Sequence, residues 1–317
     1  MLPHALIVAG PTASGKSALA VAIAERLRGT IVNTDSMQVY RELRILTARP
    51  TTEEEARAPH RLYGIRAAAE AGSVAWWREQ ALAAMDEARA SGRLPILTGG
   101  SGMYFAALTD GLADIPDPGA EARAEARRLL ADQGSAALHA SLAHVDPATA
   151  ARLKPEDSQR IARAWEVWRG TGMGLAAWQN RRSAPAPWRF TAIRLDPPRD
   201  DLRAAIAVRY EAMMRDGALD EVRNLMELNL DPNRPAMRAH GVPELSAYLR
   251  GALPLEEAGR RTELVTGQYT KRQATWFRHR ALAPQPRTFT INARFSSMAQ
   301  FSERECDDLF TFIENEG

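Results

Sequence analysis

The chain has 317 residues, 45% of them hydrophobic and 25% charged, which is typical of a globular protein with one large interrupted domain or two domains. The formal net charge of +2 excludes a protein-wide field that attracts nucleic acid, so any basic surface must be local. A single cysteine, Cys306, excludes a disulfide framework and a cysteine-rich zinc site, which favours a reducing compartment. The N-terminal apolar run is too short for a signal peptide, and no stretch approaches the ~18 apolar residues of a membrane span. We therefore expect a cytoplasmic protein without a membrane partner.

Strand and helix patterns alternate through the first third of the chain. The strand candidates are the apolar runs at residues 4–9, 30–35 and 94–98, with a weaker one at 61–65. Residues 16–27 and 73–91 read as helices, and the second begins after a candidate N-cap, Ser73. Strands that alternate with helices predict an α/β fold built on a parallel sheet.

The composition changes after Gly111 and becomes rich in Ala, Arg and Glu with little strand signal. A strand-like pattern returns at 185–198, so we interpret 112–187 as an all-helical insertion. The core would then comprise residues 1–111 and 188–317. Its later part has helix candidates at 199–215, 218–229, 241–250 and 255–280, a strand candidate at 287–293, and a helical C-terminal tail.

The stretch GPTASGKS follows the first strand candidate and matches the phosphate-loop pattern G-x-x-x-x-G-K-[ST]. Gly10 and Gly15 allow backbone conformations that turn N–H groups inward, and the helix that follows adds favourable potential for an anion. Lys16 can reach a terminal phosphate, and the Ser17 hydroxyl can bind Mg²⁺. The predicted phosphate-binding residues are Gly10, Pro11, Thr12, Ala13, Ser14, Gly15, Lys16 and Ser17. The motif predicts a polyphosphate ligand without saying which one.

Two further polar segments follow strand candidates. Asp35 in NTDSMQ could organise a metal or act as a general base, although an Asx turn or a helix N-cap is an equal alternative. Ser101 lies in GGSG after the run 94–98, which ends in Thr98 and lacks the acid of a Walker-B strand. Because the carboxyl ends of parallel strands line one crevice, we expect the phosphate loop, Asp35 and Ser101 to share a cleft.

The ordered set GPTASGKS, NTDSMQVYRELRILTARP, APHRLYGI and LTGGSGMYFAALTDGL resembles the bacterial tRNA dimethylallyltransferases, also called tRNA isopentenyltransferases. The similarity continues in EDSQRIARAWEVWRGTG, VRYEAMMRDGALDEVRNL and YTKRQATWFRHR, and it fades after about residue 285. The resemblance implies transfer of a dimethylallyl group from dimethylallyl diphosphate to N6 of adenosine 37 in tRNA, with Mg²⁺ as cofactor. The phosphate loop would then hold a leaving diphosphate.

The resemblance also assigns roles to single residues. It makes Asp35 the catalytic base that removes the N6 proton, Arg209 a diphosphate ligand, and Ser101 the hydroxyl at a position usually held by Thr. The tRNA partner would bind through its anticodon stem-loop with the target base extruded. The implied tRNA-binding residues are Asp35, Ser36, Met37, Gln38, Arg123, Gln159, Arg160, Ile161, Ala162, Arg163, Lys271, Arg272, Gln273, Trp276 and Arg278. The insertion would contribute to tRNA binding, and we expect a monomer.

The chain departs from the family pattern at GVPE (241–244), where Gly-Tyr-Lys-Glu is frequent, and at Leu46, where Gly is common. Alternative interpretations are a prenyltransferase that acts on free adenine nucleotide, a small-molecule P-loop kinase, and an RNA-binding module with a vestigial loop. The nucleotide enzyme would not need the insertion or KRQATWFRHR, and such kinases are usually shorter and carry a lid with arginines. A vestigial loop is disfavoured because Lys16, Ser17 and Asp35 are all present.

Overall fold

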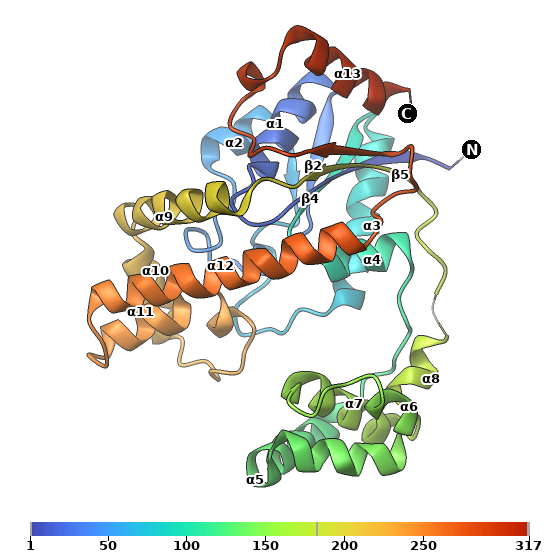
Figure 1. The fold of residues 1–317 in the computed structure, drawn as a ribbon, viewed down its shortest axis with the longest axis vertical. Helices are drawn as coiled ribbons and strands as arrows, with labels where there is room; N and C mark the ends of the chain where they lie inside the picture. Colours follow the sequence, from blue (N-terminus) through green and yellow to red (C-terminus); the bar gives the residue numbers. More distant parts are fainter. Residues whose placement is uncertain (1, 182, 316–317) are drawn as a thin grey trace. The chain divides into compact units, whose positions relative to one another are not determined.

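The computed structural model describes residues 2–181 and 183–315, which form two compact units (Figure 1). The first unit holds the described residues up to Thr109 and from Ala186 onward. The second unit is Asp110–Pro185. Each unit has its own hydrophobic core and is described by itself.

The boundary between the units lies slightly before the predicted limits of 112–187. The N–H of Ala186 donates a hydrogen bond to the carbonyl of Leu108 at 2.8 Å. Trp188 is buried in the core of the first unit. The residues just before the strand at 189 therefore belong to the first unit and not to the insertion.

The first unit is built on a parallel sheet of six strands in the order β3-β2-β4-β1-β5-β6. The strands are β1 (His4–Ala9), β2 (Gly29–Asn33), β3 (His60–Arg61), β4 (Leu94–Gly99), β5 (Arg189–Leu195) and β6 (Thr288–Ile291). This arrangement confirms the predicted α/β fold. The candidate strand at 61–65 is wrong in extent, because Leu62 and Gly64 have φ angles of 69° and 60° and leave the extended region.

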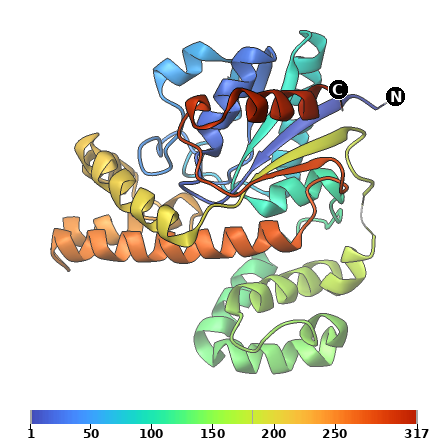
Figure 2. The same cartoon turned by 45° about the horizontal axis from the view of Figure 1, so that its top comes forward.

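Helices cover both faces of the sheet (Figure 2). Alternate residues of the strands pack into two separate cores, one on each face. Leu6 and Val8 of β1 face a core shared with α1 (Lys16–Arg26) and α13 (Glu303–Glu314). Ala5 and Ile7 face the core that includes the remaining helices of the sheet unit. Those helices are α3 (Val74–Ala90), α4 (Gly102–Thr109), α9 (Arg199–Arg215), α10 (Ala218–Glu227), α11 (Val242–Leu249) and α12 (Leu255–His279). The short α2 (Thr52–Arg57), η1 (Ala236–Arg238) and η2 (Met298–Gln300) complete this unit.

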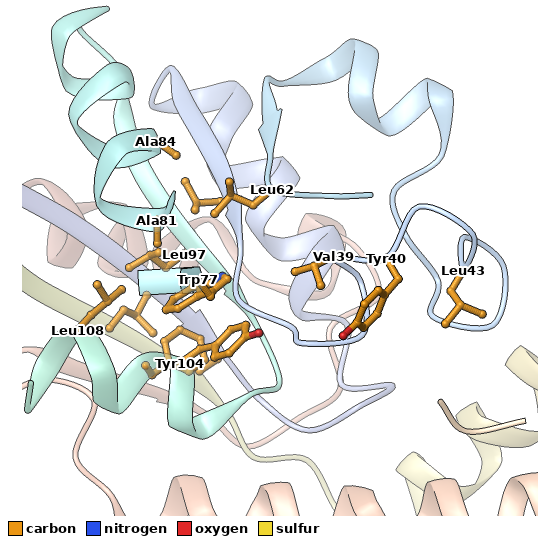
Figure 3. Packing of buried hydrophobic residues seen from close by; sticks show 14 of the residues in the cluster. Val39, Tyr40, Leu43, Leu62, Trp77, Ala81, Ala84, Leu97, Tyr104 and Leu108 are labelled. Atoms are coloured by element: carbon orange, nitrogen blue, oxygen red, sulfur yellow. The ribbon is translucent and has the colours of Figure 1, made fainter. Parts of the chain in front are cut away.

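Helix α3 holds the end of strand β2 in place. Its predicted N-cap is confirmed, since the Ser73 hydroxyl accepts a hydrogen bond from the N–H of Trp76 at 3.0 Å. One turn on, the buried Trp77 ring stacks on Tyr104 of α4 with centroids 4.1 Å apart (Figure 3). The Trp77 indole N–H donates to the carbonyl of Asn33 at 2.9 Å. This contact anchors the last residue of β2, directly before the polar segment that the sequence analysis singled out.

The second unit consists of the helices α5 (Gly119–Val145), α6 (Pro147–Ala150), α7 (Ser158–Thr171) and α8 (Leu175–Gln179). Helix α5 is interrupted at Gly134, whose φ of 79° and ψ of 171° are not helical. The buried core of the second unit is formed by Leu138, Leu142, Ala150, Ile161 and Ala164. The predicted helical character of this segment holds for the residues described.

Candidate active site

The three motifs follow neighbouring strands of the sheet. The phosphate loop follows β1, Asp35 follows β2 and Ser101 follows β4, and the sheet order places β4 between the other two. Backbone hydrogen bonds continue past the strand ends, from Thr34 N–H to the carbonyl of Thr98 at 2.8 Å and from Ser101 N–H to the carbonyl of Thr34 at 3.1 Å. The three segments therefore meet at the carboxyl ends of neighbouring strands. Of the residues predicted to share one cleft, the phosphate loop and Asp35 line the cavity described below, whereas Ser101 is not part of its lining.

The phosphate loop depends on its glycines in two different ways. Gly15 has a φ of 90°, in the region that favours glycine, and the neighbouring Ala13 has a φ of 66° although it carries a Cβ. Gly10 has no positive φ; it is needed because a Cβ there would lie 2.9 Å from Ser14 Oγ and 3.0 Å from Leu195 Cβ. The predicted conformational freedom thus applies to Gly15, whereas Gly10 serves close packing.

A segment beyond β6 lies against the phosphate loop, which the sequence did not suggest. Phe295 N–H donates to the carbonyl of Ser14 at 2.9 Å, and Arg294 Nε donates to the carbonyl of Ala13 at 3.0 Å. A Cβ on Gly15 would lie 2.0 Å from the Phe295 carbonyl oxygen. The glycine therefore permits this segment to support the loop from outside.

Lys16 begins α1 and points its ammonium group into a partly buried environment, with Nζ 3.4 Å from the carbonyl of Pro11. Burial lowers its pKa from 10.5 to about 8. The nearby Asp35 carboxylate opposes this shift, and the positive charge of Arg209 adds to it. Burial also lowers the pKa of Arg209. Two cations that lack full solvation in this way form an environment that favours an anionic ligand.

Asp35 sits in a turn that Asn33 builds. The buried Asn33 side chain accepts the N–H of Asp35 at 2.8 Å and donates to the carbonyls of Asp35 and Leu62, each at 3.0 Å. The Asp35 carboxylate oxygen Oδ1 accepts the N–H of Met37 at 2.9 Å. The predicted alternative of an Asx turn is thus present, and the same residue also lines the cavity described below.

Ser101 supports this turn from behind. Its hydroxyl oxygen accepts the N–H of Ser36 at 2.9 Å and lies 3.2 Å from the Ser36 hydroxyl. Ser101 is 8% exposed, whereas Ser36 and Asp35 line the cavity. In this structure the Ser101 hydroxyl fixes the residue next to Asp35, and Ser36 rather than Ser101 is among the residues that line the cavity.

Helix α12 packs directly on the glycines of GGSG. A Cβ on Gly100 would lie 2.1 Å from Gln273 Nε2, and one on Gly102 would lie 2.4 Å from the Trp276 ring. Gln273 is 4% exposed and Trp276 is half-buried against the core. The prediction that the Gln273 side chain contacts tRNA needs correction, because its amide is enclosed between the phosphate loop and Gly100. Glycine is required at positions 100 and 102 because α12 packs directly against them.

Helix α12 also carries exposed basic residues next to Gln273. Lys271 and Arg272 are exposed, and the Arg272 guanidinium lies over the Tyr269 ring, 5.6 Å from its centroid. Arg278 is bound instead to Asp196, which follows β5, with Nε–Oδ distances of 2.8 and 3.0 Å. Of the predicted basic contacts on this helix, Lys271 and Arg272 are presented to solvent and Arg278 is engaged in an ion pair.

The segment around Gln38 is also more structural than expected. The Gln38 amide donates to the carbonyls of Thr47 and Ala48, both at 2.9 Å, and so holds the loop that precedes α2. Met37 packs against the core below the turn. Gln38, Met37 and Ser36 all line the cavity, so each remains able to contact a ligand there.

One cavity of about 500 Å³ joins these elements. Its polar wall includes Lys16, Ser17, Asp35 and Arg209. Its apolar wall is formed largely by the loop before α2, by α9 and by the turn after η1: Leu46, Ala48, Pro50, Ala205, Ile206, Met213 and Ala239. A cavity lined by both charged and apolar side chains suits an amphiphilic ligand.

Several cavity residues were missed by sequence reasoning, among them Tyr269, His240 and Arg294. Burial and the Asp35 charge raise the pKa of Tyr269 to about 12, and burial lowers the pKa of His240. Both rings are therefore neutral at neutral pH, and they meet edge to face with centroids 4.9 Å apart. Tyr269 lies four residues before Gln273, so helical spacing could have placed it on the same face.

The loop that carries Leu46 is fixed by one acidic residue of α10. The Glu221 carboxylate accepts the N–H groups of Arg44 and Ile45, both at 2.7 Å, and that of Leu46 at 2.9 Å. The Leu46 side chain lies against Gly241, where a Cβ would be 2.9 Å from Leu46 Cδ2. The two departures from the family pattern, Leu46 and GVPE, thus meet in the structure.

In the second unit, the predicted tRNA contacts divide into surface and core residues. Gln159, Arg160 and Arg163 are exposed on α7, where Arg160 pairs with Asp157 and Arg163 with Glu166, each at 3.2 Å. Arg123 of α5 pairs with Asp117, and Ala162 is half-buried. Ile161 is a correction, because its side chain is completely buried in the core of this unit and is not available to a ligand.

The residues present fit a magnesium ion that is held mainly by its anionic partner. The described residues contain no group of three His, Cys, Asp or Glu side chains arranged to hold a metal. Mg²⁺ commonly keeps several waters and binds one or two protein oxygens together with substrate phosphates. The exposed Ser17 hydroxyl at the start of α1 matches that pattern.

None of the described helices is both long and apolar enough to cross a bilayer.

Comparisons with known proteins agree with this geometry. The family described as IPP transferase matches residues 38–280. The chain is 63% identical over 311 residues to the tRNA dimethylallyltransferase of Granulibacter bethesdensis, covering 98% of each sequence. It is 62% identical to that of Gluconacetobacter diazotrophicus, covering 97% of this chain and 93% of the relative.

Solved structures show the same similarity. The full-length tRNA isopentenylpyrophosphate transferase of Bacillus halodurans superposes with a TM-score of 0.70 at 31% identity, covering 100% of this chain and 98% of that one. A eukaryotic dimethylallyltransferase acting on tRNA gives a TM-score of 0.81 over 99% of this chain and 80% of that one, and at 23% identity it supports the fold alone. This chain therefore belongs to the IPP transferase family, the family of the bacterial tRNA dimethylallyltransferases.

Proposed function

We propose that the protein transfers the dimethylallyl group of dimethylallyl diphosphate to N6 of adenosine 37 in tRNA. The bond between C1 of the donor and the diphosphate oxygen breaks, and its electron pair leaves with the diphosphate. A bond forms between C1 and N6, and the N6 proton passes to a base. The tRNA dimethylallyltransferases that this chain resembles over nearly its whole length support this reaction.

The cations that line the cavity suit the leaving group. Lys16 and Arg209 place two cations there, and the first N–H groups of α1 have no intrahelical partners and can donate to phosphate oxygens. The charge on the diphosphate grows as the C–O bond breaks, so these donors stabilise the transition state more than the bound donor. A leaving diphosphate as the ligand also accounts for the lack of a Walker-B acid after Thr98, because no triphosphate has to be hydrolysed.

Asp35 is the residue we assign as the base. An exocyclic amine of adenine is a weak nucleophile, because its lone pair is delocalised into the ring, so removal of its proton helps the bond to form. The turn built by Asn33 and Ser101 leaves the Asp35 carboxylate on the cavity wall. The apolar wall near Leu46 and Met213 would receive the allyl chain.

Binding of tRNA would use exposed basic groups of both units. On α12 these are Lys271 and Arg272, and in the second unit they are Arg160 and Arg163, together with the half-buried Arg123. Arginine and lysine on a helix face suit phosphate contacts, which give affinity without sequence preference. We propose an anticodon stem-loop as the bound part, since its unpaired bases are the least costly to extrude.

Mg²⁺ is the proposed cofactor, and Ser17 is the residue that would hold it. The ion would neutralise part of the diphosphate charge when bound. We further propose that the protein acts in the cytoplasm as a monomer. Free adenine nucleotide is the competing acceptor, and it would leave the basic face of α12 without a role.

The observation that carries the proposal is the shared cavity of Asp35, Lys16 and Arg209, with apolar residues beside them. The test is an acceptor competition in which labelled dimethylallyl diphosphate is offered to unmodified tRNA and to AMP together. Label in the tRNA with AMP unchanged is the expected result. Label in AMP with tRNA unchanged would establish the nucleotide prenyltransferase instead.

A further inference from the structure

We propose that Gln273 is a positioning residue that holds the phosphate loop and the GGSG turn (99–102) at a fixed separation. Its amide oxygen accepts the N–H of Thr12 in the phosphate loop at 2.8 Å. Its amide nitrogen donates to the carbonyl of Gly100 at 3.0 Å. One side chain thus bridges two of the three strand-end segments from a helix that belongs to neither.

The bridge continues to the proposed base. Gly100 precedes Ser101, whose hydroxyl accepts the N–H of Ser36 at 2.9 Å, and Ser36 follows Asp35. Displacement of Gly100 would therefore be passed to the turn that carries the Asp35 carboxylate. On the other side, the amide of Thr12 is already used by Gln273, which leaves the N–H groups at the start of α1 for phosphate oxygens.

The site is built for an amide in particular. Gln273 is 4% exposed. A Cβ at position 100 would lie 2.1 Å from Gln273 Nε2, so the amide fits only because this residue is glycine. Thr12 offers a donor and Gly100 an acceptor, so the bridging group must accept at one atom and donate at the other. An amide does both, and so does a protonated carboxylic acid, whereas a carboxylate only accepts.

The bridge also connects chemistry to RNA binding. Lys271 and Arg272 directly precede Gln273 on α12 and are exposed. Helix α12 therefore presents its basic face to solvent while its buried face fixes the reacting groups. The inference rests on the proposed function for the roles of the phosphate loop and of Asp35, whereas the bridge itself is a property of the enzyme alone.

The experiment compares Gln273→Glu and Gln273→Leu with wild type over pH 6–9. The readout is the kcat/KM of each variant divided by that of wild type at the same pH. This ratio removes the effect of titrations that both enzymes share. For Gln273→Glu this ratio should rise as pH falls, by up to about tenfold per pH unit, the limit for one linked proton. For Gln273→Leu the ratio should be low at every pH, with kcat lowered and the affinity for inorganic diphosphate weakened.

Gln268→Glu is the matched control, since Gln268 is exposed on the same helix and its ratio should stay flat. A Gln273→Glu ratio independent of pH, or wild-type turnover by Gln273→Leu, would overturn the inference. If neither variant folds, amide hydrogen exchange in the wild-type enzyme decides. Protection of the Thr12 N–H like that of the sheet-bonded Thr34 supports the bridge, and free exchange overturns it. Failure of wild type to prenylate tRNA would instead contradict the proposed function.

Discussion

Lys16 and Arg209 line the same cavity, and burial lowers the pKa of Lys16 to about 8. The Asp35 charge opposes this shift, and the positive charge of Arg209 adds to it. Placing two like charges together in a partly desolvated site is unfavourable without an anion. The arrangement makes sense as one end of a binding site for a diphosphate, and it leads to two predictions for Lys16.

The first prediction concerns the pH dependence of diphosphate binding. Lys16 is charged below a pH of about 8 and neutral above it, so affinity for inorganic diphosphate should fall as pH rises from 8 to 9.5. The decrease should approach at most about tenfold per pH unit. Calorimetric titration of wild type and Lys16→Gln checks this. A wild-type affinity that is as flat as that of the variant would remove Lys16 from the site.

The second prediction concerns stability. The folded pKa of Lys16, about 8, lies below the ordinary 10.5, so the unfolded chain binds more protons between these values and stability rises with pH in that window. Below pH 8 the buried charge costs free energy. Lys16→Met should therefore raise the thermal midpoint of the unliganded protein at pH 7, and the difference should shrink as pH rises. Lys271→Met, at an exposed site, is the control and should change little. An unchanged or lower midpoint for Lys16→Met would show that the ammonium group is better solvated than the structure indicates.

The third prediction separates chemistry from binding at Asp35. Asp35→Asn keeps an oxygen that can accept the Met37 N–H, so the turn should survive while the base is lost. Turnover should fall by about 10²–10⁴-fold, the usual range for a general base. The Asp35 charge raises the pKa of Lys16, so the decline in diphosphate affinity should begin at a lower pH in the variant. Single-turnover rates and diphosphate titrations measure both effects.

Asp307→Asn, at an exposed position on α13, should match wild type in turnover and in diphosphate affinity. Wild-type turnover by Asp35→Asn would show that another group accepts the proton.

The fourth prediction concerns the basic face of α12. Lys271→Gln combined with Arg272→Gln should lower tRNA affinity and flatten its dependence on salt. Each lost phosphate contact should reduce the slope of log K against log salt by about 0.7–0.9. Arg304→Gln, which is exposed on α13, should leave the slope unchanged. An unaltered slope in the double variant would make this face a solvated surface only.

The fifth prediction tests the close packing of α12 on the strand-end turn. Gly100→Ala introduces a Cβ that would lie 2.1 Å from Gln273 Nε2, so turnover and thermal stability should both fall. Gly267→Ala, within α12 itself, meets no atom within 4 Å and should be neutral or stabilising by up to about 1 kcal/mol. Equal behaviour of the two variants in turnover and thermal unfolding would contradict the packing described here.

Much of the sheet could be predicted from sequence because β1, β2 and β4 are short, largely apolar runs that end at polar or glycine-rich segments. The phosphate loop follows from its sequence pattern, and the approach of the Asp35 and Ser101 segments to it follows from the rule that the carboxyl ends of parallel strands line one crevice. Strand β3 was predicted too long, since local sequence does not report the positive φ of Leu62.

The burial of Gln273 could not be predicted in the same way. A glutamine beside two basic residues has the chemistry of an RNA contact, and only the packing of α12 on Gly100 turns it inward. The role of Arg294 and Phe295 was hidden for a similar reason, because a segment far along the chain meets the phosphate loop through backbone contacts. The error at Ile161 has a different origin. It was included as a tRNA contact through the family resemblance, although an apolar side chain of this kind is typical of a core position.

The most direct test of the account is the reaction of the purified protein with unmodified tRNA, dimethylallyl diphosphate and Mg²⁺, without any nucleoside triphosphate. The account predicts N6-dimethylallyladenosine at position 37 after digestion, with one diphosphate released per modified base. Unmodified tRNA, or a product that requires ATP and carries a new phosphate, would contradict the assignment of the phosphate loop to a leaving diphosphate.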